Sequence, residues 1–132
     1  MSVAGANVAR MISPNPDQRP ARGRAGEDAA LRVYEGRGYA LVARNWRCPL
    51  GEIDLLLLRR GTLVVCEVKT RSGAAFGGGY EAVTWSKRRK LRQLVEALMQ
   101  QSGSRIRQVR FDVASVWLGG GRADIEIFED AF

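Results

Sequence analysis

The chain of 132 residues contains no histidine and only two cysteines. The absence of histidine excludes Ser–His and Cys–His nucleophilic pairs, HExxH zinc proteases and histidine general acids, because each of these needs an imidazole. Cys48 and Cys66 are too few for a disulfide framework, and too few for a structural zinc site without histidine. Any chemistry must therefore depend on carboxylates, Lys, Arg, Ser, Thr, Tyr or Cys. Two isolated cysteines predict reduced thiols in a cytoplasmic protein.

Long apolar runs are also missing. The longest, Leu55–Leu58, is far shorter than the roughly 20 residues that span a bilayer. Residues 1–12 lack the roughly 7–15 apolar residues at the centre of a signal peptide, so we expect no membrane partner. Residues 1–22 contain three prolines and scattered arginines without periodicity, which predicts a flexible basic tail. The remaining residues, 23–132, suit a single domain.

The charge is strongly basic and unevenly placed. Lys and Arg number 21 against 14 Asp and Glu, a formal charge of +7. Clustered cations favour a polyanionic partner such as nucleic acid, whereas the alternative is a solvated face of an arginine-rich helix. The candidate nucleic-acid contacts are Lys87, Arg88, Arg89, Lys90, Arg92 and Arg71.

The pattern of apolar residues predicts an α/β fold. Helical spacing covers residues 24–37 and the segment from Ser86 to about residue 101. Extended runs cover residues 39–47, 52–59, 62–71, 109–118 and 123–129, the last being a short edge strand. The Gly-rich segment 72–79 lacks the Gly-Lys-Ser/Thr ending of a phosphate-binding loop, so we expect no nucleotide cofactor.

The two central strands place two carboxylates opposite one another. If Arg60 and Gly61 form a two-residue hairpin loop, paired positions sum to 121, and Asp54 lies opposite Glu67. Residues directly opposite share a face, with Cβ atoms roughly 4.5–5.5 Å apart, and like charges there are destabilising. A divalent cation between them would remove the repulsion, and two hard oxygen ligands suit Mg²⁺ or Mn²⁺.

Lys69 shares the face of Glu67, because alternate residues of a strand point the same way. An ammonium beside a carboxylate-bound metal can stabilise a phosphoryl transition state or orient the attacking water. The alternative is structural: Glu52 would lie opposite Lys69, and salt bridges from Lys69 to Glu52 and Glu67 would be worth only about 0–1 kcal/mol. Spacing alone leaves both interpretations open.

Three further residues are candidates for the same site. Glu27 shares a helical face with apolar residues at i+3, i+4 and i+7, which predicts a buried carboxylate; a favourable helix dipole is the alternative explanation. Lys87 heads the apolar stripe of the second helix, where it could equally be an amphipathic residue at the edge of the core. Asp112 could join the acidic residues or simply pair with Arg110.

Several segments together resemble the YraN-like proteins, a bacterial family grouped with the PD-(D/E)XK nucleases and close to Holliday-junction resolvases. The segments are Gly26-Glu27-Asp28-x-Ala30, Asn45-Trp46-Arg47-Cys48-Pro49, Gly51-Glu52-Ile53-Asp54-Leu55, Glu67-Val68-Lys69-Thr70-Arg71, Lys87-Arg88-Arg89 and Arg110-Phe111-Asp112-Val113. The resemblance covers about residues 22–118. It implies an αβββαβ restriction-endonuclease-like core with a mixed central sheet flanked by helices. It also implies that Glu27, Asp54, Glu67 and Lys69 meet at one metal site, with Lys87 as a fifth member.

The expected function is metal-dependent hydrolysis of phosphodiester bonds in DNA by an endonuclease, with branched or damaged repair and recombination intermediates as the substrates. Asp54, Glu67 and the Val68 backbone carbonyl would hold Mg²⁺ or Mn²⁺, and Lys69 would orient the attacking water. One alternative is a catalytically inactive DNA-binding module of a repair complex, and another is an RNA-associated basic protein. A homodimer is a further expectation, because resolvase-like proteins often dimerise to cut two strands.

Overall fold

A computed structural model describes residues 21–48, 51–72, 85–102 and 106–131. The elements are α2 (Ala21–Gly36), β1 (Ala40–Cys48), β2 (Gly51–Arg59), β3 (Thr62–Ser72), α3 (Trp85–Ser102), β4 (Gln108–Gly119) and β5 (Arg122–Phe128). The predicted order of helices and strands is confirmed. Because α2 begins at Ala21, the last two residues of the predicted tail belong to this helix, and residues 1–20 and 73–84 lie outside the described residues.

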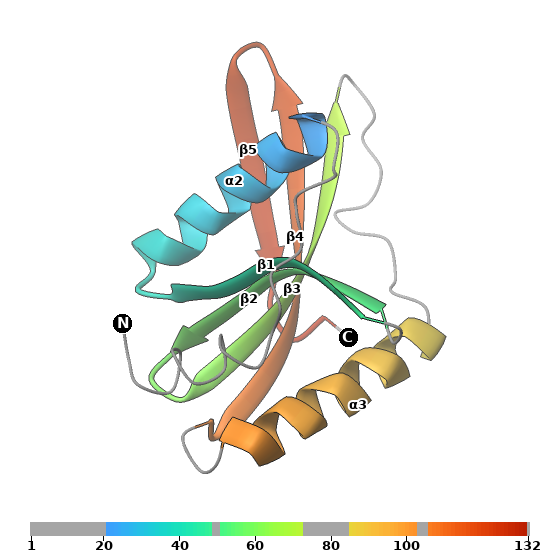
Figure 1. Cartoon of the computed structure of the whole chain (residues 1–132). Helices are drawn as coiled ribbons and strands as arrows, with labels where there is room; N and C mark the ends of the chain where they lie inside the picture. The colour runs from blue at the N-terminus through green and yellow to red at the C-terminus, as the bar shows by residue number, and fades with distance from the viewer. Residues whose placement is uncertain (1–20, 49–50, 73–84, 103–105, 132) are drawn as a thin grey trace.

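The five strands form one mixed sheet in the order β1-β2-β3-β4-β5 (Figure 1). All neighbours are antiparallel except β3 and β4, which are parallel. A parallel pair needs a long crossover, and α3 lies in the connection between these two strands. β5 pairs only with β4, as expected for an edge strand. No helix in the described part of the chain is long and apolar enough to cross a membrane.

The core has two halves, one on each face of the sheet. Leu56 and Leu58 of β2 pack with Leu91 of α3 in one cluster, whereas Leu55 and Leu57 pack with residues of α2 in the other. The consecutive leucines of β2 are therefore explained by helices covering both faces, since a strand buried on both sides needs apolar residues at successive positions. The predicted α/β architecture with flanking helices is confirmed.

The β2–β3 hairpin has the predicted two-residue loop. Arg59 pairs with Thr62 and Leu55 with Cys66. Arg60 and Gly61 have φ values of 47° and 81°, the positive values that a type I′ turn requires at both central positions. The register therefore follows the predicted sum of 121 from the turn to Leu55, the residue next to Asp54.

Gly26 allows α2 to cross β3 at close range. A Cβ atom added at this buried position would overlap Oγ1 of Thr70 on β3. Only glycine lets the helix and strand approach this closely, and the approach sets the position of the next residue, Glu27. The Gly-Glu pair found in the sequence thus has a packing explanation.

Candidate active site

The candidate site lies where β2 and β3 stop pairing with one another. The last paired residues are Leu55 and Cys66, so Asp54 and Glu67 follow the end of the ladder instead of forming its next pair. The backbone N–H of Val68 donates a hydrogen bond of 2.8 Å to Oδ2 of Asp54. The N–H and C=O of one strand residue lie on the same side of the strand, which places the Val68 carbonyl on the Asp54 side.

Both carboxylates are buried, and a lysine lies beside them. Asp54 is 2% exposed and Glu67 is 8% exposed. Nζ of Lys69 is 4.0 Å from Oε1 of Glu67, at the limit of an ion pair, and the lysine side chain remains partly exposed. Of the two salt bridges in the alternative interpretation, the structure shows the one from Lys69 to Glu67, whereas Glu52 on the outer part of β2 is 3.5 Å from Arg47 of β1.

Glu27 on α2 is buried, as its helical spacing predicted, with an exposure of 1%. Arg44 of β1 neutralises it: its Nε is 3.3 Å from Oε1 of Glu27, and a second nitrogen contacts Asp28 at 2.6 Å. Partial burial opposes the charged form of Arg44, but the hydrogen bonds to Asp28 and Glu27 outweigh it and raise its pKa. An ion pair from β1 therefore supports the buried carboxylate, and sequence reasoning missed Arg44 because no local spacing links it to α2.

Asn45 is a second residue that the sequence interpretation missed. It is buried, has a φ of 54°, and its Oδ1 has no hydrogen-bond partner among the described residues. It lies between the β1–β2 pairs Arg44–Leu55 and Trp46–Ile53, opposite Asp54. Asparagine tolerates positive φ better than most residues, so an Asn within an extended run was the available signal for a local distortion beside the carboxylates.

Asp54 and Glu67 supply carboxylate oxygens, the type of ligand that Mg²⁺ prefers. Among the described residues, no group of three or more His, Cys, Asp or Glu side chains is arranged to hold a metal ion, so Glu27 does not form a three-carboxylate cluster with them. Magnesium is commonly bound through one or two carboxylates together with water and substrate phosphates. Two buried carboxylates and the adjacent Val68 carbonyl therefore fit Mg²⁺ or Mn²⁺.

The candidate nucleic-acid contacts on α3 and β3 differ in how exposed their side chains are. Arg89 and Lys90 are exposed and line a hollow of about 240 Å³ with Ser86 and Gln93. The guanidinium of Arg92 stacks 4.5 Å from the centre of the Phe111 ring, whereas Arg88 and Arg71 are partly buried. The side chain of Lys87 lies outside the described part of the structure, so its predicted place at the site stays a prediction.

Asp112 belongs to a separate buried network on the α2 side. Arg110 donates two hydrogen bonds of 2.9 Å to its carboxylate, and the Tyr34 hydroxyl donates a third of 2.8 Å. Asp112 is fully buried, and this network joins α2 to β4. Of the two predicted roles for Asp112, pairing with Arg110 is the one the structure shows.

Cys66 lies between this network and the candidate site. Burial is the main cause that raises the pKa of its thiol, and the charges of Asp112, Asp54 and Glu67 raise it further, against a hydrogen bond with Tyr34 that lowers it. The residue is a free, buried cysteine. A thiol held in its neutral form is a poor nucleophile, so Cys66 has the properties of a core residue.

Comparison with known proteins identifies the family of the chain. Residues 26–116 match the family described as "Uncharacterised protein family UPF0102". The chain belongs to the UPF0102 family. This is the YraN-like group that the sequence segments resemble, and the matched region runs from the glycine before Glu27 to the middle of β4.

UPF0102 proteins from distant bacteria resemble the chain over most of its length. The chain is 46% identical over 110 residues to the UPF0102 protein of Clavibacter michiganensis, covering 83% of this chain and 93% of the relative. Identity is 43% over 113 residues with a Rhodococcus jostii member, covering 85% and 96%. With a Moorella thermoacetica member it is 40% over 116 residues, covering 86% and 97%.

Proposed function

We propose that this UPF0102 protein is a metal-dependent endonuclease that hydrolyses phosphodiester bonds in DNA, acting on branched or damaged intermediates. The observation that carries the proposal is the pair of buried carboxylates, Asp54 and Glu67, placed where the β2–β3 ladder ends and beside Lys69. Burying two like charges at one place is costly. A divalent cation bound between them would compensate that cost during function.

Asp54, Glu67 and the Val68 carbonyl would hold the metal, which supplies charge neutralisation at a phosphate oxygen and a water of lowered pKa. The hydrogen bond from the Val68 N–H fixes Oδ2 of Asp54, so this carboxylate needs no reorganisation when a ligand arrives. The Lys69 ammonium lies within reach of Glu67 and of solvent, where it can donate to a phosphate oxygen or to the attacking water.

The experiment is cleavage of labelled four-way-junction, flap and linear DNA with Mg²⁺ or Mn²⁺. Asp54→Asn keeps an acceptor for the Val68 N–H and removes the charge, while Lys69→Gln removes the ammonium. We expect each variant to lose more than about 100-fold in cleavage rate, as for loss of a metal-supporting or charge-stabilising group. Asp124→Asn is the matched control, because this aspartate is exposed on β5 and pairs only weakly with Arg122.

The outcomes separate the proposal from its rivals. Metal-dependent cutting that both site variants lose and the control retains would support the nuclease. If wild-type protein binds these DNAs but cuts none of them with either metal, the endonuclease is wrong and a catalytically inactive DNA-binding module replaces it. Preference for structured RNA in competition with branched DNA would point to an RNA-associated protein.

A further inference from the structure

Four exposed arginines gather at the end of the sheet opposite the carboxylates. Arg59 and Arg60 come from the β2–β3 turn, Arg107 precedes β4, and Arg37 follows α2. We call them the hairpin-end arginines. The carbonyl of Gly61 accepts hydrogen bonds from the backbone N–H groups of Arg107 and Gln108, which places the start of β4 against the turn.

The α2–β1 connection completes this surface. A Cβ at Gly38 would lie 3.4 Å from Nε of Arg59, so the residue after Arg37 touches the Arg59 side chain. Gly38, Ala40, Leu58, Arg59 and Arg60 line a hollow of about 330 Å³. The segments that carry the hairpin-end arginines therefore adjoin one another although they are distant in sequence.

Among the residues that the structure describes, no acidic side chain pairs with these cations. In the part of the chain that the structure describes, no ion pair within 4.0 Å involves Arg37, Arg59, Arg60 or Arg107. Glu129, on the segment after β5, is already paired with Arg110 at 3.2 Å. The contact recorded for Arg59 is a stacking of its guanidinium 5.6 Å from the Tyr39 ring centre, which leaves its charge uncompensated.

Arg60 also occupies a position that disfavours it. Its φ of 47° is the left-handed conformation that Gly, Asn or Asp adopt more easily at the first central position of a type I′ turn. An arginine there costs stability that a turn-forming residue would not. The positive charge at the tip of the hairpin thus has no structural explanation within the described chain.

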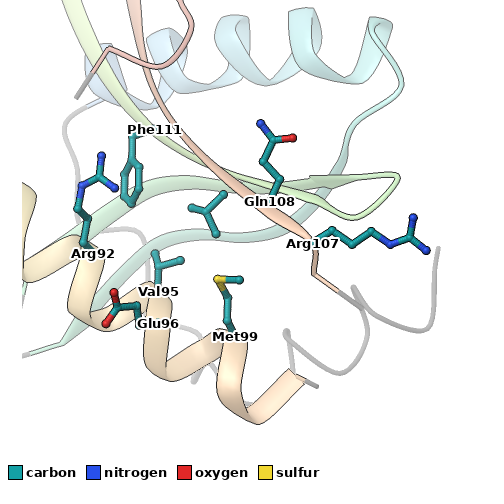
Figure 2. Close-up of a pocket in the computed structure, with 8 residues that line it drawn as sticks. Arg92, Val95, Glu96, Met99, Arg107, Gln108 and Phe111 are labelled. Atoms are coloured by element: carbon teal, nitrogen blue, oxygen red, sulfur yellow. The ribbon is translucent and has the colours of Figure 1, made fainter. Parts of the chain in front are cut away.

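A groove between α3 and β4 leads from Arg107 toward α3 (Figure 2). It has a volume of about 220 Å³ and is lined by Val95, Met99 and Phe111 among others. Figure 2 shows Arg92 and Arg107 at opposite ends of this groove, with Glu96 on the α3 side. Arg107 therefore adjoins the turn and lies at the end of the groove away from Arg92.

We propose that the hairpin-end arginines bind the backbone phosphates of a duplex arm of the DNA substrate, at a distance from the bond that is cut. This inference rests on the proposed DNA-directed function and adds a second contact region to it. Arg60 follows Asp54 by six positions, which corresponds to roughly 20 Å along a strand. At 3.4 Å per base pair, the arm must extend roughly six base pairs from the carboxylates to reach the turn.

The test is the salt dependence of duplex binding, measured by anisotropy of a fluorescein-labelled 20-base-pair DNA without divalent metal. Each phosphate that a cation neutralises contributes about 0.9 to the slope of log affinity against log salt concentration. We expect Arg60→Gln/Arg107→Gln to reduce the magnitude of the slope by about 1.8. The matched control is Arg32→Gln/Arg122→Gln, which removes two exposed charges from α2 and β5 and should leave the slope unchanged.

The possible results distinguish an error in the proposed contact surface from an error in the proposed DNA-directed function. All substituted side chains are exposed, so both double variants should keep the wild-type melting temperature. If wild-type protein binds the duplex and the Arg60/Arg107 variant retains its full slope, the hairpin-end surface is wrong while DNA binding stands. An equal loss of slope in both double variants would also overturn it, since only total charge would matter. If wild-type protein does not bind the duplex at 50 mM salt, the inference about a duplex arm is wrong, whereas the proposed function on branched DNA is decided separately by the cleavage assay.

Discussion

Replacing Gly26 by alanine should shift α2 and destabilise the protein. The added Cβ would overlap Oγ1 of Thr70 and lie only 3.0 Å from its Cβ and Cγ2. Thr70 belongs to β3, which is held between β2 and β4. The strand has little freedom to withdraw, so the helix must move away from it and take Glu27 with it.

The expected magnitude follows from two opposing effects. Alanine inside a helix is favoured over glycine by about 1 kcal/mol. Overpacking a well-packed contact costs about 1–3 kcal/mol, and overlap with three atoms of one side chain places this substitution near the upper end. The free energy of unfolding should therefore fall by about 2 kcal/mol. Thr70→Ala removes two of the three atoms, so the double variant should recover at least about 1 kcal/mol of coupling energy.

The assay is urea denaturation followed by tryptophan fluorescence. Gly36→Ala is the internal control, because a Cβ at Gly36 on the same helix meets nothing within 4 Å, and this change should leave stability equal or higher. If Gly26→Ala is as stable as Gly36→Ala, the close approach of α2 to β3 is wrong, and so is the packing explanation for this glycine.

Three other measurements test different parts of the structure. Arg110→Gln should cost about 3–5 kcal/mol of stability, because it leaves the Asp112 carboxylate buried without its cation. Tyr34→Phe removes one hydrogen bond to this charged group and should cost about 1.5–3 kcal/mol. Equal costs of the two variants in urea denaturation would refute this ranking. Cys66 stays protonated when folded but ionises near pH 8.5 when unfolded, so above that pH its contribution to stability should fall by about 1.4 kcal/mol per unit. Cys66→Ala should remove most of this slope in denaturation curves between pH 8 and pH 9, below the range near pH 10 where buried Tyr34, whose pKa is also raised by burial, adds a slope of its own. An unchanged slope between pH 8 and pH 9 would count against the raised pKa of Cys66. Mg²⁺ at a hundredfold excess over its dissociation constant should stabilise wild-type protein by about 2.7 kcal/mol and Asp54→Asn much less; equal stabilisation in thermal melts would place the metal elsewhere.

The sequence by itself determined the order of elements, the hairpin register and the burial of Glu27. These features depend on local rules: side chains alternate along a strand, a two-residue loop fixes which residues are opposite, and helical spacing shows which residues share a face. The loop length predicted that Asp54 and Glu67 form the next pair, but the ladder ends one pair earlier, at Leu55 and Cys66. The same local rules placed Leu91, Leu94 and Val95 on the buried face of α3.

Only the tertiary structure decided which charges meet. The β2–β3 ladder ends before Asp54, whose carboxylate instead accepts a hydrogen bond from Val68. Arg44 reaches Glu27 because α2 crosses β1 and β3. The hairpin-end arginines come together because the parallel pairing of β3 with β4 starts at the turn. Contacts between elements that are distant in sequence depend on the order and direction in which the strands join the sheet. The local spacing of apolar and polar residues does not predict that order.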